Sequence, residues 1–276
     1  MLRVSHLSGF GRIVPAVGGG GDSDVAAFIS ATGISDGTIE SALEALVTSL
    51  KADGIWTKCI AIYPFVGGSS STHSYNLKNT AAYQISWSGT VTHNSNGITG
   101  DGSTGYGNTG IQASGGALSV HSTHLSVYSG TNPGSDQNMW EIGSSENGVS
   151  WLALRLRYGS SQLSSLMYST SSTSVNPSPP GDRSGFWIGS RRANNDHELY
   201  HNGASFDTNT TTESVAVLPV RNIYISALSW AGPSAIEHSD RNLRFASVGA
   251  GLTDTEAADF HTAVETFQDA LSRGVV

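Results

Sequence analysis

Five residues in the second half of the chain have the spacing of a zinc-protease motif, because HELYH at 197–201 fits the pattern H-E-x-x-H. In zinc proteases this pattern lies on a helix, where both histidines reach one zinc ion and the glutamate polarises water. Here it runs into Asn-Gly at 202–203, the strongest short-range hairpin signal. On a strand, His197 and His201 would share a face but lie about 13 Å apart. We therefore interpret the motif as a surface hairpin, and nothing in the sequence brings His261 to it.

Two carboxylates offer a second possible reaction. The stretch NMWEIGSSENG at 138–148 resembles the catalytic strand of laminarinase-like glycosidases, which carry Glu-Ile-Asp and then another glutamate. Such retaining enzymes hold two carboxylates about 5–5.5 Å apart. Glu141 and Glu146 would fill these places, but Gly143 replaces the aspartate that orients the nucleophile. A glycosidase is therefore the least favoured function, and the alternative is a strand residue followed by an Asn-Gly turn.

Other candidate sites are weaker still. The stretch SNGITGDGSTGYGN could supply oxygen ligands for calcium, but Asp101 is its only carboxylate and the EF-hand spacing is absent. We interpret it as strand, turn and strand, with Tyr106 packed under a loop. No G-x-S-x-G elbow is present for a serine nucleophile. We expect no catalytic residues, metal or cofactor. The tryptophans belong mainly to the core, with one or two exposed as sugar-stacking platforms: Trp56, Trp87, Trp140, Trp151, Trp187 and Trp230.

The composition favours a β-rich protein with a polar, weakly charged surface. Charged residues make up 13% of the 276 residues, against about 25% in typical proteins. The 33 glycines suit many short strands and turns. A net charge of −8 disfavours a nucleic-acid partner. One cysteine, Cys59, excludes an internal disulfide. No apolar run reaches the roughly 18 residues that span a membrane, and we expect no cleaved export signal.

Two segments have helical periodicity. Within residues 24–58 a shorter helix precedes a longer one, whose apolar stripe recurs every three or four residues at Ile39, Leu43, Leu46, Val47 and Leu50. Ser35 and Asp36 offer N-cap oxygens, and Gly54 lies where a C-cap residue belongs. Within residues 251–276, Thr253 and Glu256 form a capping box. We expect this C-terminal helix to pack on the main domain.

Residues 59–250 between these helices have strand patterns throughout. Alternating or β-rich runs are separated by turn-rich pieces such as GDGSTGYGNTG and NPSPPGDRSG, which is typical of a sandwich or barrel. The expected strands are CIAIYPF, AYQISWS, HLSVYSG, NMWEIGS, SWLALRLRY, LSSLMYS, GFWIGSR, ELYHNG and NIYISALSW.

Residues 1–23 form a separate segment that ends in four glycines, 18–21. Glycine loses the most backbone entropy on ordering, so this run is a flexible tether. A disordered tail is one interpretation. The other is a docking arm that orders on a partner. The residues proposed to anchor it are apolar or basic: Leu2, Arg3, Val4, Leu7, Phe10 and Arg12.

Several stretches resemble known families. NGITGDGSTGYGNTG, HSTHLSVYSG, ELYHNGAS and NIYISAL look like parts of the concanavalin A-like or laminin-G-like jelly roll. GIWTKCIAIYPFVGGSSSTHSYNLKN and FASVGAGLTDTEAADFHTAVETFQDAL resemble virion structural proteins of tailed bacteriophages, in which two helical segments frame such a domain. This resemblance implies display on the particle surface, self-association and glycan binding, without catalysis.

The sequence thus predicts a mostly β protein, a concanavalin A-like jelly-roll sandwich at 59–250. Short N-terminal helices at 24–58 and a C-terminal helix at 251–276 flank it, and residues 1–23 form an extended arm. The expected function is a non-enzymatic virion surface protein, as capsid decoration, head fibre or tail component, assembled in the host cytoplasm. Expected partners are other virion proteins, reached through residues 1–23, and further copies of the chain. The alternative is an adhesin that binds cell-surface polysaccharide.

Overall fold

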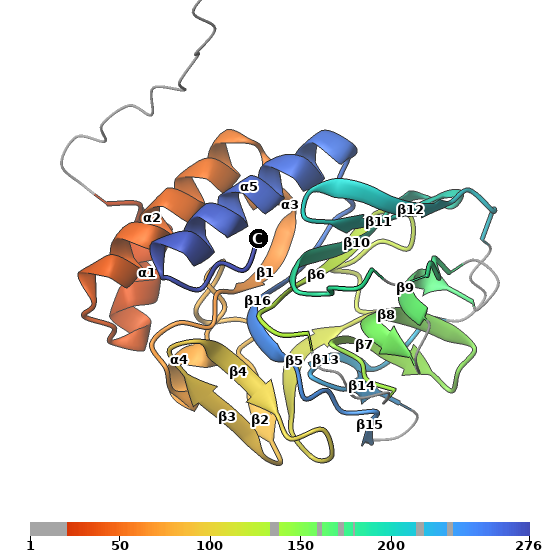
Figure 1. The fold of residues 1–276 in the computed structure, drawn as a ribbon, viewed down its shortest axis with the longest axis horizontal. Coiled ribbons are helices and arrows are strands. Elements are labelled where there is room, and N and C mark those ends of the chain that lie inside the picture. Colours follow the sequence, from red (N-terminus) through yellow and green to blue (C-terminus); the bar gives the residue numbers. More distant parts are fainter. Residues whose placement is uncertain are drawn as a thin grey trace, which may run out of the picture.

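The computed structural model describes residues 21–132, 138–158, 162–170, 174–178, 180–213, 218–230 and 234–276. Two β-sheets form a sandwich, and helices cover the outer face of one sheet (Figure 1). The mostly β sandwich predicted from the sequence is confirmed. The proposed anchor, Leu2 to Arg12, lies outside the described residues. Among the helices of the described ranges, none is long and apolar enough to cross a membrane.

The helices begin where side chains can cap them. Asp22 accepts from the Asp24 amide and Asp36 accepts from the Thr38 amide, so each satisfies a backbone donor at a helix start. The predicted capping box of Thr253 and Glu256 is present. The helices are α1 (Ser23–Thr32), α2 (Gly37–Ala52), α3 (Ile55–Lys58), α4 (Ser70–His73) and α5 (Asp254–Ala270). We call α1, α2, α3 and α5 the helical layer.

Sheet A is antiparallel in every pair and has the order β12-β11-β10-β6-β16-β4-β3, with β1 also paired to β16. Its strands are β1 (Cys59–Tyr63), β3 (Val91–Asn94), β4 (Gly97–Gly100), β6 (Thr123–Ser129), β10 (Gly185–Ala193), β11 (Asp196–His201), β12 (Ala204–Asn209) and β16 (Asn242–Gly249). The central strand β16 was not among the expected strands.

Sheet B has the order β15-β14-β7-β13-β5-β2, with β8 paired to β7 and β9 paired to β8. Its strands are β2 (Ser86–Ser88), β5 (Tyr106–Gln112), β7 (Ile142–Glu146), β8 (Ser150–Tyr158), β9 (Gln162–Ser169), β13 (Asn222–Ile225), β14 (Leu228–Ser229) and β15 (Ala235–Ile236). The expected strands at 82–88 and 138–144 begin late, at Ser86 and Ile142.

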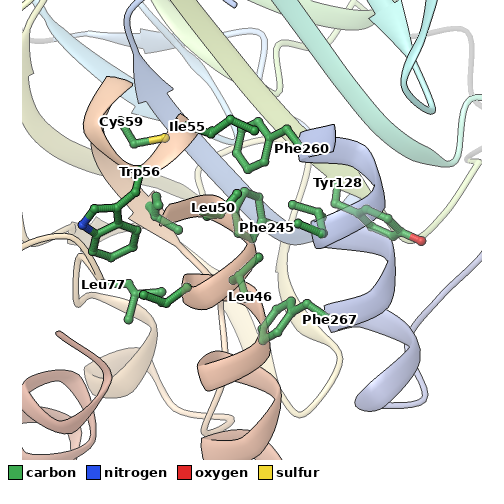
Figure 2. Close-up of a cluster of buried hydrophobic side chains, with 14 of the residues drawn as sticks. Leu46, Leu50, Ile55, Trp56, Cys59, Leu77, Tyr128, Phe245, Phe260 and Phe267 are labelled. Atoms are coloured by element: carbon green, nitrogen blue, oxygen red, sulfur yellow. The ribbon is translucent and has the colours of Figure 1, made fainter. Parts of the chain in front are cut away.

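Two apolar cores hold the layers together. One lies between the sheets and takes side chains such as Val127 of sheet A and Leu154 of sheet B. The other lies between sheet A and the helical layer (Figure 2), where Phe245 of β16 packs edge-on to Phe260 of α5 at 5.9 Å. Sheet A therefore has both faces buried. Sheet B contributes only one face to these cores.

The HELYH letters lie on β11, as predicted, and the hairpin is confirmed. Asn202 and Gly203 have φ of 49° and 77°, as the turn requires. The strand is more buried than a surface hairpin, because β11 lies between β10 and β12 and His197 is 2% exposed. The expectation about His261 was wrong: a Cβ on Gly203 would lie 3.0 Å from His261 Cβ, so α5 packs directly on this turn.

Candidate functional site

Three tryptophans meet on the outer face of sheet B. On β8 the strand alternation sends Leu152 and Leu154 into the core and Trp151 and Arg155 outward. Trp151 stacks on Trp140, with centroids 5.4 Å apart and planes inclined by 22°. Trp230 also contacts Trp151, with centroids 5.3 Å apart and planes inclined by 55°. The three rings therefore form a continuous aromatic surface from residues 90 positions apart in the chain.

Hydrogen bonds hold the orientation of two of these rings. The Trp140 indole N–H donates to Glu237 Oε2 at 2.6 Å, and that of Trp151 donates to the Gly148 carbonyl at 3.2 Å. Trp140 is 2% exposed, whereas Trp151 and Trp230 are half-buried. Trp140 thus forms the floor, and the other two offer ring area to a ligand.

A cavity of about 280 Å³ opens beside Trp140 and Trp151, and Trp230 borders it through its contact with Trp151. The Arg155 guanidinium lies 4.5 Å from the centroid of the Trp140 ring and donates through Nε to Ser164 Oγ at 3.0 Å. Glu237 brings a half-buried carboxylate to the same cavity. We call this site, formed by Trp140, Trp151, Trp230, Arg155, Ser164 and Glu237, the tryptophan cleft.

The β7–β8 turn positions Trp230. Asn147 and Gly148 have φ of 50° and 72°, a tight Asn-Gly turn like the one after HELYH. A Cβ on Gly148 would lie 2.9 Å from Trp230 Cη2, closer than van der Waals contact allows. Glycine is therefore required here both for the backbone conformation and for the approach of the indole.

A larger hollow of about 570 Å³ lies between the α1–α2 turn, the end of α5 and the chain after β1. The residues that line this hollow include no aromatic ring, and the arginine among them, Arg273, is bonded to the protein itself. Arg273 is 3% exposed and donates to the backbone carbonyls of Pro64, Phe65 and Ser95. This hollow therefore has less recognition chemistry than the tryptophan cleft.

The structure does not bring Glu141 and Glu146 together. Five residues along an extended chain span about 16 Å, far from the glycosidase spacing. Glu141 is fully buried, 3.0 Å from Arg241 Nε, and accepts from the Leu156 amide at 2.6 Å. Burial raises the pKa of Glu141, and the Arg241 charge opposes that shift. Glu146 accepts instead from the Val220 amide at the end of β7.

The residues of the zinc and calcium motifs have partners within the protein. His197 Nε2 lies 2.9 Å from Ser165 Oγ, and His201 stacks on Trp187 at 3.9 Å. Asp101 accepts from the Thr104 hydroxyl and from neighbouring amides, which lowers the pKa of its carboxyl. Tyr106 stacks on Tyr224, as part of β5. Within the described ranges, no three His, Cys, Asp or Glu residues are placed to hold a metal ion.

Sequence reasoning allowed for exposed tryptophans but did not say which. The alternation on β8 was the available signal, since it places Trp151 and Arg155 on the face opposite three buried leucines. Nothing in the sequence links Trp140 or Trp230 to them. The remaining tryptophans serve elsewhere: Trp187 in the core between the sheets, Trp56 against two lysines, and Trp87 on edge strand β2.

The sequence matches no protein-family model and no curated protein. Solved structures match the fold. Domain 4 of an extracellular arabinanase from Geobacillus stearothermophilus, in complex with arabinotriose, is 15% identical with a TM-score of 0.50, covering 74% of this chain and 98% of the domain. A botulinum neurotoxin type C structure, whose cell entry depends on two ganglioside molecules, is 13% identical with a TM-score of 0.51 and coverages of 77% and 53%.

A sialidase from Trypanosoma rangeli, in complex with sialic acid, is 12% identical with a TM-score of 0.51. The match covers 85% of this chain and 39% of the sialidase, so the chain spans about two fifths of that protein and about half of the toxin. At these identities the likeness concerns the fold alone. This chain has a lectin-like β-sandwich fold.

Proposed function

We propose that this chain is a non-catalytic carbohydrate-binding protein and that sugar rings bind in the tryptophan cleft. The observation that carries the proposal is the contiguous set of Trp140, Trp151 and Trp230 beside one guanidinium and one carboxylate. The C–H face of a sugar ring packs on an indole, while its hydroxyls bond to planar polar side chains at the edge. Apolar walls with a few placed polar groups are the usual composition of a ligand site.

The arrangement of the layers also supports the outer face of sheet B as the binding face. The helical layer covers the outer face of sheet A (Figure 1). The tryptophans lie instead on the outer face of sheet B, in a cluster with Ala153 of β8 and Leu166 of β9. Trp151 and Trp230 pack on their inner side against a small cluster that includes Leu166 and Leu228, and both remain half-buried. The arabinotriose and ganglioside recorded for proteins of this fold are further support for a glycan ligand.

A glycan array probed with the native chain and Trp151→Ala tests the proposal. We expect the native chain to bind, and the variant to lose at least about tenfold in affinity, which is ~1.4 kcal/mol. Trp87→Ala is the matched control, because Trp87 is also a half-buried tryptophan of sheet B but lies on edge strand β2. Equal binding by native chain and Trp151→Ala would remove the cleft from the proposal. Release of reducing ends from a bound glycan would contradict the non-catalytic part.

We also propose that the cleft is displayed on a tailed-phage particle, assembled in the host cytoplasm, with residues 1–23 as the anchor and several copies per particle. The resemblance of the two helical segments to phage virion proteins is the support. The described chain begins beside the helical layer, on the side of the sandwich opposite the cleft, where Asp22 pairs with Lys51 at 2.7 Å. An anchor on that side leaves the cleft facing outward.

A truncated chain tests the anchor. The deletion is best confined to residues 1–20, because Asp22 caps α1 and its loss would disturb the fold. We expect the truncated protein to fold and bind glycan normally but to be missing from particles assembled in its presence. Particles that incorporate it at the native level would overturn the anchoring role.

A further inference from the structure

We infer that the tryptophan cleft selects short neutral glycans over acidic ones, and that Glu237 is the residue that sets this selectivity. The inference rests on the proposed glycan binding. It assigns a role to a carboxylate that neither the sequence patterns nor the fold mark out.

Glu237 is held beside the aromatic floor in an unusual way. Its backbone has φ of 49°, in the left-handed region that residues other than glycine rarely adopt. Its side chain accepts from the Trp140 indole at 2.6 Å, and its carbonyl accepts from the Trp140 amide at 3.0 Å. Strained backbone that is held by its surroundings is concentrated at functional sites. The chain thus places this carboxylate at the cavity rather than leaving it in solvent.

A fixed carboxylate distinguishes ligands by their hydrogen-bonding capacity. An ionised carboxylate only accepts hydrogen bonds, so it pairs with sugar hydroxyls, which can donate. The carboxylate of a sialic or uronic acid also only accepts, so it would offer Glu237 no donor besides the Trp140 indole and would add like-charge repulsion at short range. Neutral sugars are therefore favoured at this edge of the cleft.

The cation of the cleft is partly engaged within the protein. Arg155 lies over the Trp140 ring and donates through Nε, one of its five N–H groups, to Ser164 Oγ. Its charge is shared with the ring, which weakens its attraction for an incoming carboxylate. The whole chain also carries 22 acidic residues against 14 lysines and arginines. A net negative charge slows the approach of polyanionic glycans and weakens their binding at low salt.

The size of the cavity limits the length of the ligand. At about 280 Å³ it lies at the lower limit of small-molecule sites, which measure about 300–1,000 Å³. Trp140 and Trp151 line the cavity, and among the described residues Trp230 continues the aromatic surface beyond it. This favours one or two sugar rings, as at the end of a glycan chain, over a long groove along a polymer.

An array that pairs neutral glycans with acidic counterparts, such as lactose with 3′-sialyllactose and galactotriose with trigalacturonate, tests the inference at low and physiological salt. We expect the native chain to favour the neutral member of each bound pair by at least tenfold. Glu237→Gln keeps the shape and an acceptor oxygen but removes the charge, and we expect the preference to fall several-fold. Glu40→Gln makes the same charge change on the helical layer and should leave the preference intact.

The outcomes distinguish a failure of the selectivity from a failure of glycan binding. Binding of acidic members as tight as or tighter than the neutral ones would overturn the selectivity and leave glycan binding standing. A neutral preference that is equal in the native chain and in Glu237→Gln would overturn the role of Glu237. Binding to no member of the array would overturn the proposed function itself. Circular dichroism and thermal unfolding establish that each variant is folded.

Discussion

At the scale of single residues, the buried carboxylate that looked like a nucleophile stabilises the fold. Glu141 and Arg241 are both fully buried and form an ion pair at 3.0 Å. Removing one partner of such a pair leaves the other charge unpaired in a low-dielectric interior. This usually lowers the free energy of unfolding by about 3–5 kcal/mol. The sequence could flag Glu141 as a chemically interesting residue but could not show that its partner comes from a segment 100 positions away.

We therefore predict that Glu141→Ala lowers the free energy of unfolding by about 3–5 kcal/mol, measured by urea denaturation. Glu146→Ala is the control, because Glu146 lies 3.7 Å from Arg221 in a partly exposed pair, and such pairs contribute about 0–1 kcal/mol. A small and equal effect of both changes would contradict the structural role of Glu141.

A buried histidine makes the stability depend on pH. Burial lowers the pKa of His124 to about 4, while an unfolded chain has a histidine pKa near about 6.5. Below pH about 6.5 the unfolded chain takes up a proton that folded His124 does not, so stability is full above that pH and falls progressively toward pH about 4.

We predict that the native chain loses more stability between pH 7.5 and pH 4.5, on the order of ~3 kcal/mol more, than His124→Gln does. Both proteins share all other titrating groups, so the difference reports His124 alone. Urea midpoints at three pH values provide the measurement. Parallel pH profiles for the two proteins would show that His124 is not the group responsible.

At the scale of elements, the signals that succeeded were local ones. The Asn-Gly pair after HELYH predicted a hairpin because it supplies two positive φ angles, and Thr253 with Glu256 predicted a helix start because they cap each other. The strand β16 was not predicted, because both of its faces are buried and its register shifts between Leu243 and Phe245. Its sequence therefore lacks a simple alternation of apolar and polar residues. The cleft could not be predicted because its residues converge from β8, from β9 and from the segments before β7, after β14 and after β15.

The β7–β8 turn gives a prediction at this scale. In Gly148→Ala the new Cβ would displace Trp230, so we expect glycan affinity to fall roughly fivefold, ~1 kcal/mol. Gly33→Ala is the control, because Gly33 also has positive φ, at 68°, but has no atom within 4 Å of the added Cβ. Both variants bear backbone strain, so both should lose stability. Calorimetric titration with an array-positive oligosaccharide distinguishes them, and equal affinities would contradict the support role of Gly148.

At the scale of the whole molecule, the two outer faces of the sandwich differ. One is covered by the helical layer, beside which the described chain begins, and the other carries the tryptophan cleft. Composition and strand patterning were enough to predict a sandwich with flanking helices. They could not predict this division, because it depends on which sheet the helices cover, and that follows from long-range packing such as Phe245 against Phe260.

The central claim is that sugars bind at the three tryptophans of the cleft, and the indole N–H signals of the six tryptophans test it directly. In a ¹H–¹⁵N titration with an array-positive neutral oligosaccharide, we expect the signals of Trp140, Trp151 and Trp230 to shift with saturation. Those of Trp56, Trp87 and Trp187 should stay in place. Saturable binding that moves the second set, and leaves the first unchanged, would contradict the account.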